Sequence, residues 1–123
     1  MYKDIGCGEV REEQVGKFFR FAGWVHKRRD HGSLIFIDLR DSKGIVQIVF
    51  DPSNSEESHQ IALSLRSEWV IEVEGTVQKR IKGAENPNLE TGKVEIIATQ
   101  IRILNKSKTP PFEINEEINV DEN

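Results

Sequence analysis

The residues best suited to chemistry in this chain are aromatic, amide and basic side chains on predicted strands. Phe36 alternates with Ile35 and Ile37 in an extended segment, so it faces away from the side that those two residues would bury. An exposed ring can stack on an unpaired base, while a nearby guanidinium or amide, here Arg29 or Gln47, binds phosphate or a base edge. This combination is typical of single-stranded nucleic acid recognition. The alternative left open by strand parity is that Phe36 packs beneath a loop or helix.

Nothing in the sequence suggests a catalytic or metal-binding site. The three histidines are scattered, and there is no glycine-rich phosphate loop and no zinc spacing. We therefore expect no catalytic residue, metal or cofactor in this chain and no enzymatic activity by the chain alone. The single cysteine, Cys7, is interpreted as an incidental residue near the terminus. With no long apolar run and no secretory signal, the sequence predicts a cytoplasmic protein without a membrane partner.

The charge balance is acidic but uneven. The 123 residues carry a formal net charge of −4, with 37% hydrophobic and 31% charged residues, as expected for one small domain with a large solvated surface. Most of the acidic excess lies after residue 105, whereas basic residues cluster at 27–29 and within 79–82. Such clusters can hold a short stretch of phosphate backbone but cannot coat a long duplex.

Five strands and one helix are predicted to position these groups. Alternating apolar residues predict strands at 17–26, 34–40, 45–50, 69–78 and 93–104. A helix is expected after Pro52, capped by Ser53 or Ser55. This order favours an all-β fold, a five-stranded OB-fold barrel with one helix between the third and fourth strands. A different five-stranded barrel is the alternative.

Several irregular positions are also predicted. Residues 28–33 are expected to form a polar turn, and Gly23 a bend or bulge in the first strand. The broken alternation around Glu95 predicts a bulge or an exposed strand end there. Residues 1–105 would form the domain, and the polar, acidic segment 106–123 would form a linker.

The chain resembles a known family over almost its whole length. The run GWVHKRRDHGSLIFIDLRD, from Gly23 to Asp41, is similar to the N-terminal signature of bacterial-type aspartyl-tRNA synthetases, which are class IIb aminoacyl-tRNA synthetases. The segments GIVQIVFDP at 44–52 and NPNLETG at 86–92 extend the resemblance. The synthetases for asparagine and lysine share a shorter pattern and resemble this chain less.

The resemblance implies the anticodon-binding OB-fold domain of an aspartate–tRNA ligase, cut off before its catalytic domain. Phe36 matches the aromatic residue that stacks on the central uridine, and Gln47 a glutamine that reads anticodon bases. The residues implied to contact the anticodon stem-loop are Arg29, His31, Phe36, Gln47, Arg80, Gly83, Asn86 and Glu95.

The same resemblance implies the partners and cofactors of the full-length enzyme. The partner of this domain would be tRNA-Asp. A histidine at 31 and a glycine at 83 resemble the relaxed-specificity form, which would also charge tRNA-Asn; the alternative is that both are merely turn residues. ATP, Mg²⁺ and a homodimer interface are expected in the catalytic domain, outside this chain.

Two other functions are considered from the residues. A free-standing OB-fold protein that binds single strands without base preference should carry several outward aromatic residues and a basic charge. This chain offers Phe36 and is acidic. An OB domain used for protein contact would need an exposed apolar patch, which the polar face of the second strand does not supply.

Overall fold

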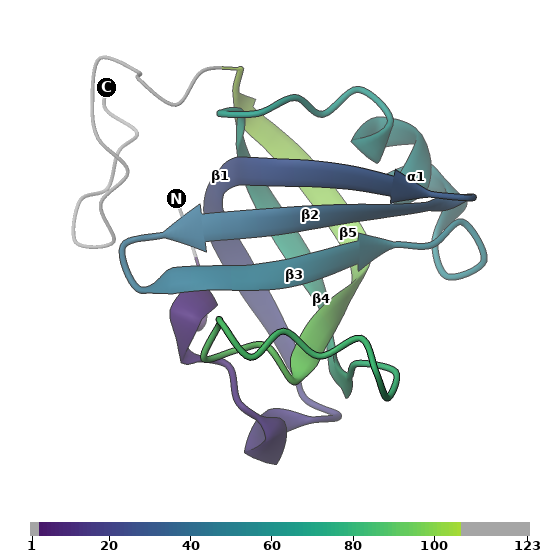
Figure 1. Ribbon diagram of the computed structural model, residues 1–123. Helices are drawn as coiled ribbons and strands as arrows, with labels where there is room; N and C mark the ends of the chain where they lie inside the picture. The colour runs from purple at the N-terminus through teal and green to yellow at the C-terminus, as the bar shows by residue number, and fades with distance from the viewer. Residues whose placement is uncertain (1–2, 107–123) are drawn as a thin grey trace.

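The computed structural model describes residues 3–106, in which five strands form one closed barrel (Figure 1). In order around the barrel the strands are β1 (Phe18–His31), β2 (Leu34–Asp41), β3 (Gly44–Phe50), β5 (Val94–Asn105) and β4 (Val70–Lys79). One helix, α1 (Glu56–Ala62), lies between β3 and β4, and two 3-10 helices, η1 (Cys7–Glu9) and η2 (Glu12–Gln14), precede β1. The predicted OB-fold is confirmed. The linker predicted for 106–123 lies outside the described residues, apart from Lys106.

Strand alternation separates the core from the outer face. On β2, Ile35, Ile37 and Leu39 are buried, whereas Phe36 and Asp38 on the other side of the strand are only partly covered. The barrel closes between β3 and β5. These two strands run parallel and pair at two positions, 48 with 96 and 49 with 97.

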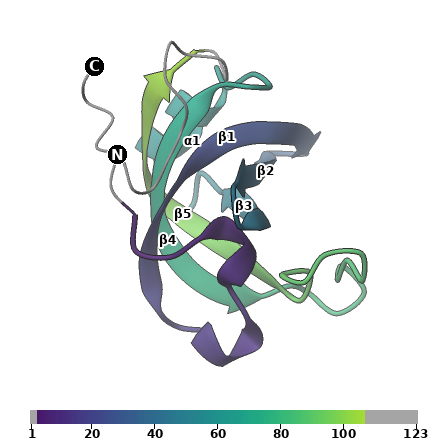
Figure 2. The same cartoon turned by 90° about the vertical axis from the view of Figure 1, so that its left-hand side faces the viewer.

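Short helical segments lie at opposite ends of the barrel (Figure 2). Ala62 and Leu65, at and after the end of α1, join the core, and the Ser55 side chain caps α1 as one of the two predicted caps. Cys7 in η1 is fully buried in the same core. The interpretation of Cys7 as incidental is therefore wrong, because its side chain packs in the core. Nothing in the sequence indicates this burial, since the segment before β1 has no periodic apolar pattern.

β1 is longer than predicted. Residues 28–31 pair with β2 up to His31 opposite Leu34, which leaves only Gly32 and Ser33 in the turn. Gly32 has the positive φ, +64°, that such a two-residue hairpin turn favours. The predicted polar turn over 28–33 is wrong because pairing with β2 outweighs the polar composition of the segment.

The irregularity of β1 also differs from the prediction. Its register against β2 shifts between Val25 and Lys27, so the bulge falls at His26 and not at Gly23. Glycine is needed at position 23 because β2 lies close to it: a Cβ there would collide with the backbone carbonyl oxygen of Arg40.

The bulge in β5 explains the position of Glu95. The register against β4 shifts between Glu74 and Gly75, which leaves Thr99 as the extra residue. Residues 95 and 101 would face the same side of a regular strand. The extra residue reverses the alternation beyond Thr99, so Ile101 joins the core while Glu95 lies on the outer face. β5 therefore does contain a bulge, but the position predicted for it, at Glu95, is wrong.

Candidate nucleic-acid interface

A continuous series of side-chain hydrogen bonds crosses the outer face of all five strands. It joins Asp38 on β2, Arg29 on β1, Gln47 on β3, Glu95 on β5 and Gln78 on β4, and we call these five residues the polar chain. Arg29 donates to both carboxylate oxygens of Asp38 at 3.0 Å and, through Nη2, to Gln47 Oε1 at 2.9 Å. Gln47 Nε2 donates to Glu95 Oε1 at 2.9 Å, and Gln78 Nε2 donates to Glu95 Oε2 at 2.9 Å.

Strand register brings these residues together. Asp38 on β2 stands opposite Gln47 on β3, and Gln78 on β4 stands opposite Glu95 on β5. The parallel seam between β3 and β5 then places Gln47 beside Glu95. The polar chain therefore depends on closure of the barrel and cannot form on any single hairpin.

The centre of the polar chain is covered. Gln47 is 7% exposed and Glu95 8% exposed, and both are hydrogen-bonded, as buried polar groups generally are. Bonding to Asp38 raises the pKa of Arg29 above its ordinary value, so the guanidinium stays charged. Because low-dielectric surroundings strengthen such bonds, these side chains hold fixed orientations before any ligand arrives.

Arg80 lies beside the polar chain with an unsatisfied donor. It is 8% exposed, and its Nε and Nη1 donate to the carbonyl oxygens of Val94 (3.0 Å) and Ala84 (3.4 Å). Its Nη2 is the one buried side-chain nitrogen or oxygen of residues 3–106 without a hydrogen-bond partner. Burial lowers the pKa of Arg80, while the charges of Glu95 and Asp38 act in the opposite direction. An unpaired buried donor costs about 1–3 kcal/mol, which a ligand acceptor would offset.

Phe36 lies on the outer face, as its parity predicted. It is half-buried, stands outside the hydrophobic core cluster, and pairs with Arg29 on β1 and Val49 on β3. Gln47 stands two pairs along, opposite Asp38, and so does not face Phe36 directly. Stacking of the Phe36 ring on a base remains a prediction.

The other three predicted contacts take no part in the polar chain within residues 3–106. The Asn86 side-chain oxygen accepts a bond from the backbone of Asn88 at 3.0 Å and so shapes the loop between β4 and β5. Gly83 is exposed in the same loop with a φ of +95°, which is itself a reason for glycine. His31 is exposed at the end of β1.

Within the basic cluster at 27–29, Arg28 contacts the end of α1, whereas Arg29 belongs to the polar chain. Arg28 donates to three carbonyl oxygens at and after the end of α1 and pairs with Asp30 at 2.8 Å. Those carbonyl oxygens belong to Ala62, Leu63 and Leu65. Arg28 therefore ties β1 to the helix end, and the expectation that it holds phosphate does not fit this geometry.

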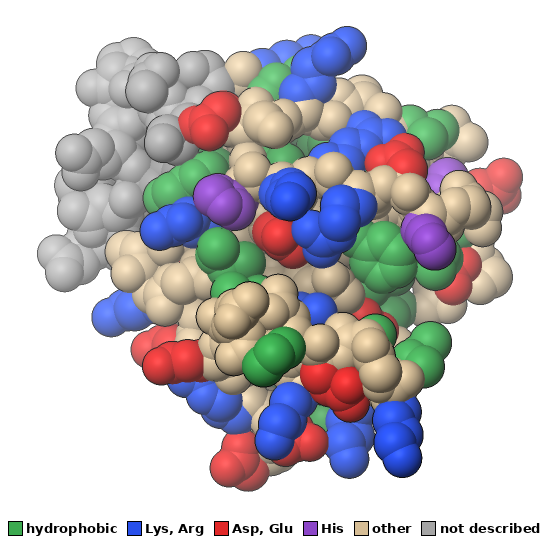
Figure 3. Space-filling view, viewed as in Figure 1, with side chains coloured by type: hydrophobic (Ala, Val, Ile, Leu, Met, Phe, Trp, Pro, Cys, Tyr) green, Lys and Arg blue, Asp and Glu red, His purple; other side chains and the backbone are tan. Residues whose placement is uncertain are grey.

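The space-filling view shows the surface that results. Lys and Arg side chains gather over β1 and β2 in the middle of the face, with acidic side chains among them (Figure 3). The polar chain contributes to this mixture, since it joins one guanidinium group, two carboxylates and two amides. An acidic domain can in this way present local positive charge to a short stretch of RNA.

Sequence reasoning missed Asp38 and Gln78 as members of the site. Asp38 shares the outer parity of Phe36, which was a usable signal. Gln78 could be placed only with the register of β4 against β5. In the part of the chain that the structure describes, no helix is long and apolar enough to cross a membrane, and no group of three His, Cys, Asp or Glu residues could hold a metal ion.

Comparisons with known proteins identify the family of this chain. Residues 19–104 match the tRNA anticodon family described as an OB-fold nucleic acid binding domain. The chain is 58% identical over 118 residues to the aspartate–tRNA ligase of Staphylococcus epidermidis, covering 95% of this chain and 20% of that protein. It is 54% identical over 116 residues to the aspartate–tRNA(Asp/Asn) ligase of Halothermothrix orenii, with 94% and 20% coverage.

A solved structure of another aminoacyl-tRNA synthetase is similar to this chain in fold and sequence. The asparaginyl-tRNA synthetase of Pyrococcus horikoshii in complex with asparaginyl-adenylate superimposes with a TM-score of 0.72 at 33% identity, covering 95% of this chain and 25% of that one. The chain thus spans about a fifth of the length of the curated ligases it matches. It belongs to the tRNA anticodon-binding family of OB-fold nucleic acid binding domains and corresponds to that domain of aspartate–tRNA ligases.

Proposed function

We propose that this domain recognises the anticodon of tRNA-Asp on behalf of a full-length aspartate–tRNA ligase. Its reading surface would be the outer face of β1, β2, β3 and β5 with the loop between β4 and β5. The contacts are the eight predicted ones, with Phe36 stacking on the central uridine and Gln47 and Glu95 reading base edges.

The observation that carries this proposal is the unpaired Nη2 of Arg80, a side chain that lies within electrostatic reach of Glu95. A buried guanidinium nitrogen without a partner favours a ligand that brings an acceptor, such as a base carbonyl or a phosphate oxygen. Glu95 supplies an acceptor for a guanine edge next to this donor. A free-standing binder without base preference would not need oriented donors and acceptors buried to this extent.

Titration of RNA stem-loops tests the proposal. The 123-residue chain is titrated with an RNA stem-loop that carries the anticodon GUC, and with versions that change each anticodon base in turn. We expect the strongest binding to GUC, with each wrong base costing about 1–3 kcal/mol by analogy with edge readout in nucleic acids. Equal affinity for all stem-loops would reject base recognition and favour the free-standing alternative.

The activity of the full-length protein is part of the same proposal. The resemblance and the ligase relatives support ATP-dependent attachment of aspartate to tRNA in the cytoplasm, with ATP and Mg²⁺ bound in the catalytic domain and a homodimer formed through it. The residues of this chain would contribute recognition and positioning of the tRNA, not the chemical step.

The proposal extends to the full-length enzyme charging tRNA-Asn as well as tRNA-Asp. Their anticodons differ only at the third base, where cytosine presents a donor and uracil an acceptor. A neutral imidazole at His31 can offer either a donor or an acceptor, and Gly83 adds no side chain that rejects a base. The name of the Halothermothrix orenii relative includes both tRNAs, whereas that of the Staphylococcus epidermidis relative does not.

Aminoacylation of both transcripts by the full-length enzyme decides this point. We expect comparable aspartylation of tRNA-Asp and tRNA-Asn, and a His31→Leu variant that loses activity selectively on tRNA-Asn. Negligible aspartylation of tRNA-Asn by the unmodified enzyme would assign it to the strict form.

A further inference from the structure

We propose that Asp38 and Gln78, which are not among the eight predicted contacts, are positioning residues that fix the base preference of Gln47 and Glu95. The inference rests on the proposed function and extends it to the two ends of the polar chain. Asp38 and Gln78 would act through their neighbours, by deciding which way the amide and carboxylate groups at the centre point.

The bonding pattern fixes the direction of the Gln47 amide. Its Oε1 accepts from Arg29 and its Nε2 donates to Glu95, both at 2.9 Å. A rotation of the amide by half a turn would set its NH₂ against a guanidinium and its oxygen against a carboxylate, so both contacts would become repulsive. Gln47 therefore presents one N–H and one lone pair to a ligand in a single arrangement.

Asp38 secures the first end of this arrangement. Its carboxylate is 15% exposed and binds Arg29 through two parallel bonds, whereas the Arg29 side chain itself is 40% exposed. Burial lowers the pKa of Arg80; the charge of Asp38 acts against this shift, and the charge of Arg29 adds to it. Without the Asp38 carboxylate, Arg29 would face the like charge of Arg80. Arg29 would then turn toward solvent, and Gln47 Oε1 would lose its donor.

Gln78 secures the other end. Its Nε2 donates to Glu95 Oε2, and because Gln47 holds Oε1, both oxygens of the carboxylate are fixed in plane and direction. Each oxygen keeps a further lone pair for a ligand donor. A neutral amide provides this support without cancelling the negative charge that favours the donor edge of a guanine.

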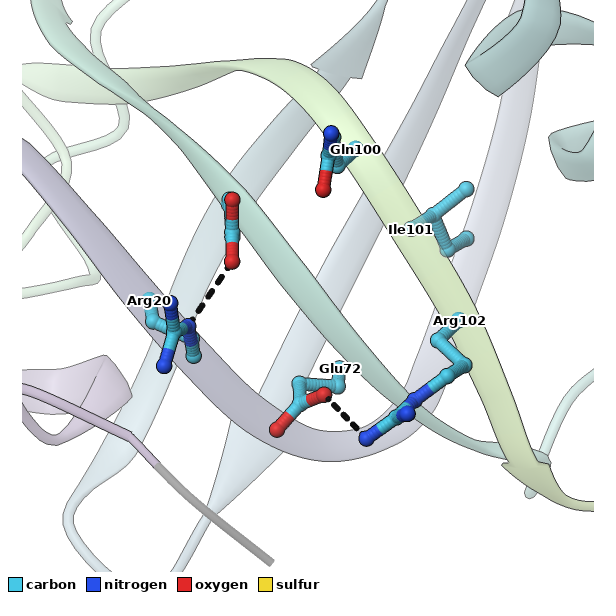
Figure 4. Close-up of a pocket in the computed structure, with 6 residues that line it drawn as sticks. Arg20, Glu72, Gln100, Ile101 and Arg102 are labelled. Carbon is cyan, nitrogen blue, oxygen red and sulfur yellow. Dashed lines mark hydrogen bonds and ion pairs between the residues drawn. The ribbon is translucent and has the colours of Figure 1, made fainter.

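Matched pairs of variants separate positioning from general stability. Asp38→Asn removes the ion pair with Arg29, and Gln78→Met removes the donor to Glu95 with little change in size. Glu74→Gln is the control for the first, because Arg20 and Glu74 form a comparable ion pair at 2.8 Å on a different face of the barrel (Figure 4).

Gln100→Met is the control for the second change. Gln100 is an exposed glutamine on β5 in the same hollow as Arg20 and Glu74, beside Ile101 and Arg102 (Figure 4). Each pair of variants therefore makes one kind of change, carboxylate to amide or glutamine to methionine, once on the polar chain and once away from it.

The readout is the ratio of affinities for the GUC stem-loop and its single-base variants, measured beside thermal unfolding. We expect Asp38→Asn and Gln78→Met to reduce this ratio about three- to tenfold at one or more anticodon positions, the effect of losing one hydrogen bond. Both controls should leave the ratio unchanged. The effect of Gln78→Met should disappear in a Glu95→Ala background, and that of Asp38→Asn in a Gln47→Ala background.

The outcomes distinguish this inference from the proposed function. If the unmodified chain prefers GUC and the two variants keep its full preference, the positioning roles are rejected while the proposed function stands. A lower melting temperature with an unchanged ratio likewise rejects them, since it reveals a structural role alone. If the unmodified chain itself shows no anticodon preference, the proposed function fails, and the inference fails with it.

Discussion

Replacing Phe36 by alanine should weaken RNA binding and leave the barrel largely intact. The ring lies on the outer face of β2, half-buried and outside the core cluster, between Arg29 on β1 and Val49 on β3. A ring in that position loses little packing on truncation, but a base that stacks on it loses its platform. The change therefore separates a recognition role from a packing role.

The expected magnitudes differ enough to be measured. Loss of one base–aromatic stack costs about 1–3 kcal/mol, which is a roughly 5- to 150-fold rise in Kd for the GUC stem-loop. Removal of a core phenylalanine lowers the free energy of unfolding by about 3–5 kcal/mol. Phe50 on β3, 1% exposed, provides that comparison through Phe50→Ala.

Fluorescence anisotropy with labelled stem-loop and urea unfolding of each variant provide the two measurements. Phe36→Ala should shift the binding curve at nearly constant stability, whereas Phe50→Ala should shift the unfolding curve. A Phe36→Ala variant that loses several kcal/mol of stability and binds RNA as before would refute the assignment. The ring would then belong to the packing beneath the neighbouring loop.

Three further changes test other parts of the structure. Arg28→Ala should lower the free energy of unfolding by about 1–3 kcal/mol, since it removes donors to the end of α1; a fall in RNA affinity at unchanged stability would contradict this role. Gly23→Ala should cost about 1–3 kcal/mol in thermal unfolding because its Cβ collides with Arg40, and a neutral effect would show that β2 can move away. Burial, with Asp41 nearby, raises the pKa of the Cys7 thiol well above its ordinary value. The free energy of unfolding should therefore decline as the pH rises above about 8.5, where only the unfolded thiol ionises. A chromogenic thiol reagent should react with Cys7 only on unfolding, and rapid reaction of the folded chain would contradict this burial.

The fold could be predicted from sequence because its elements carry strong periodic signals. Ile35, Ile37 and Leu39 alternate clearly enough to place β2 and to turn Phe36 outward. The prediction failed where tertiary pairing decides the outcome. The polar residues 28–31 are strand only because β2 lies alongside them.

The site was predicted less completely for a related reason. The family resemblance pointed to Gln47 and Glu95, but their burial and mutual bond follow from closure of the barrel, which joins residues 48 positions apart. Arg28 and Arg29 are adjacent in sequence and look equivalent there. The alternation of β1 sends one to the helix end and the other to Asp38.

The two-pair seam between β3 and β5 links recognition to local opening of the barrel. Because this parallel contact is so short and joins strands far apart in sequence, we expect it to open at a lower free-energy cost than the longer antiparallel pairings. The bond between Gln47 and Glu95 spans the seam, so opening would separate the two residues that are proposed to read base edges. RNA that binds only the closed form must therefore slow amide exchange at Ile96 and Ile97, far more than at the well-paired hairpin of β1 and β2. Bound anticodon would in this way stabilise the pairing of β3 with β5 and keep the barrel closed.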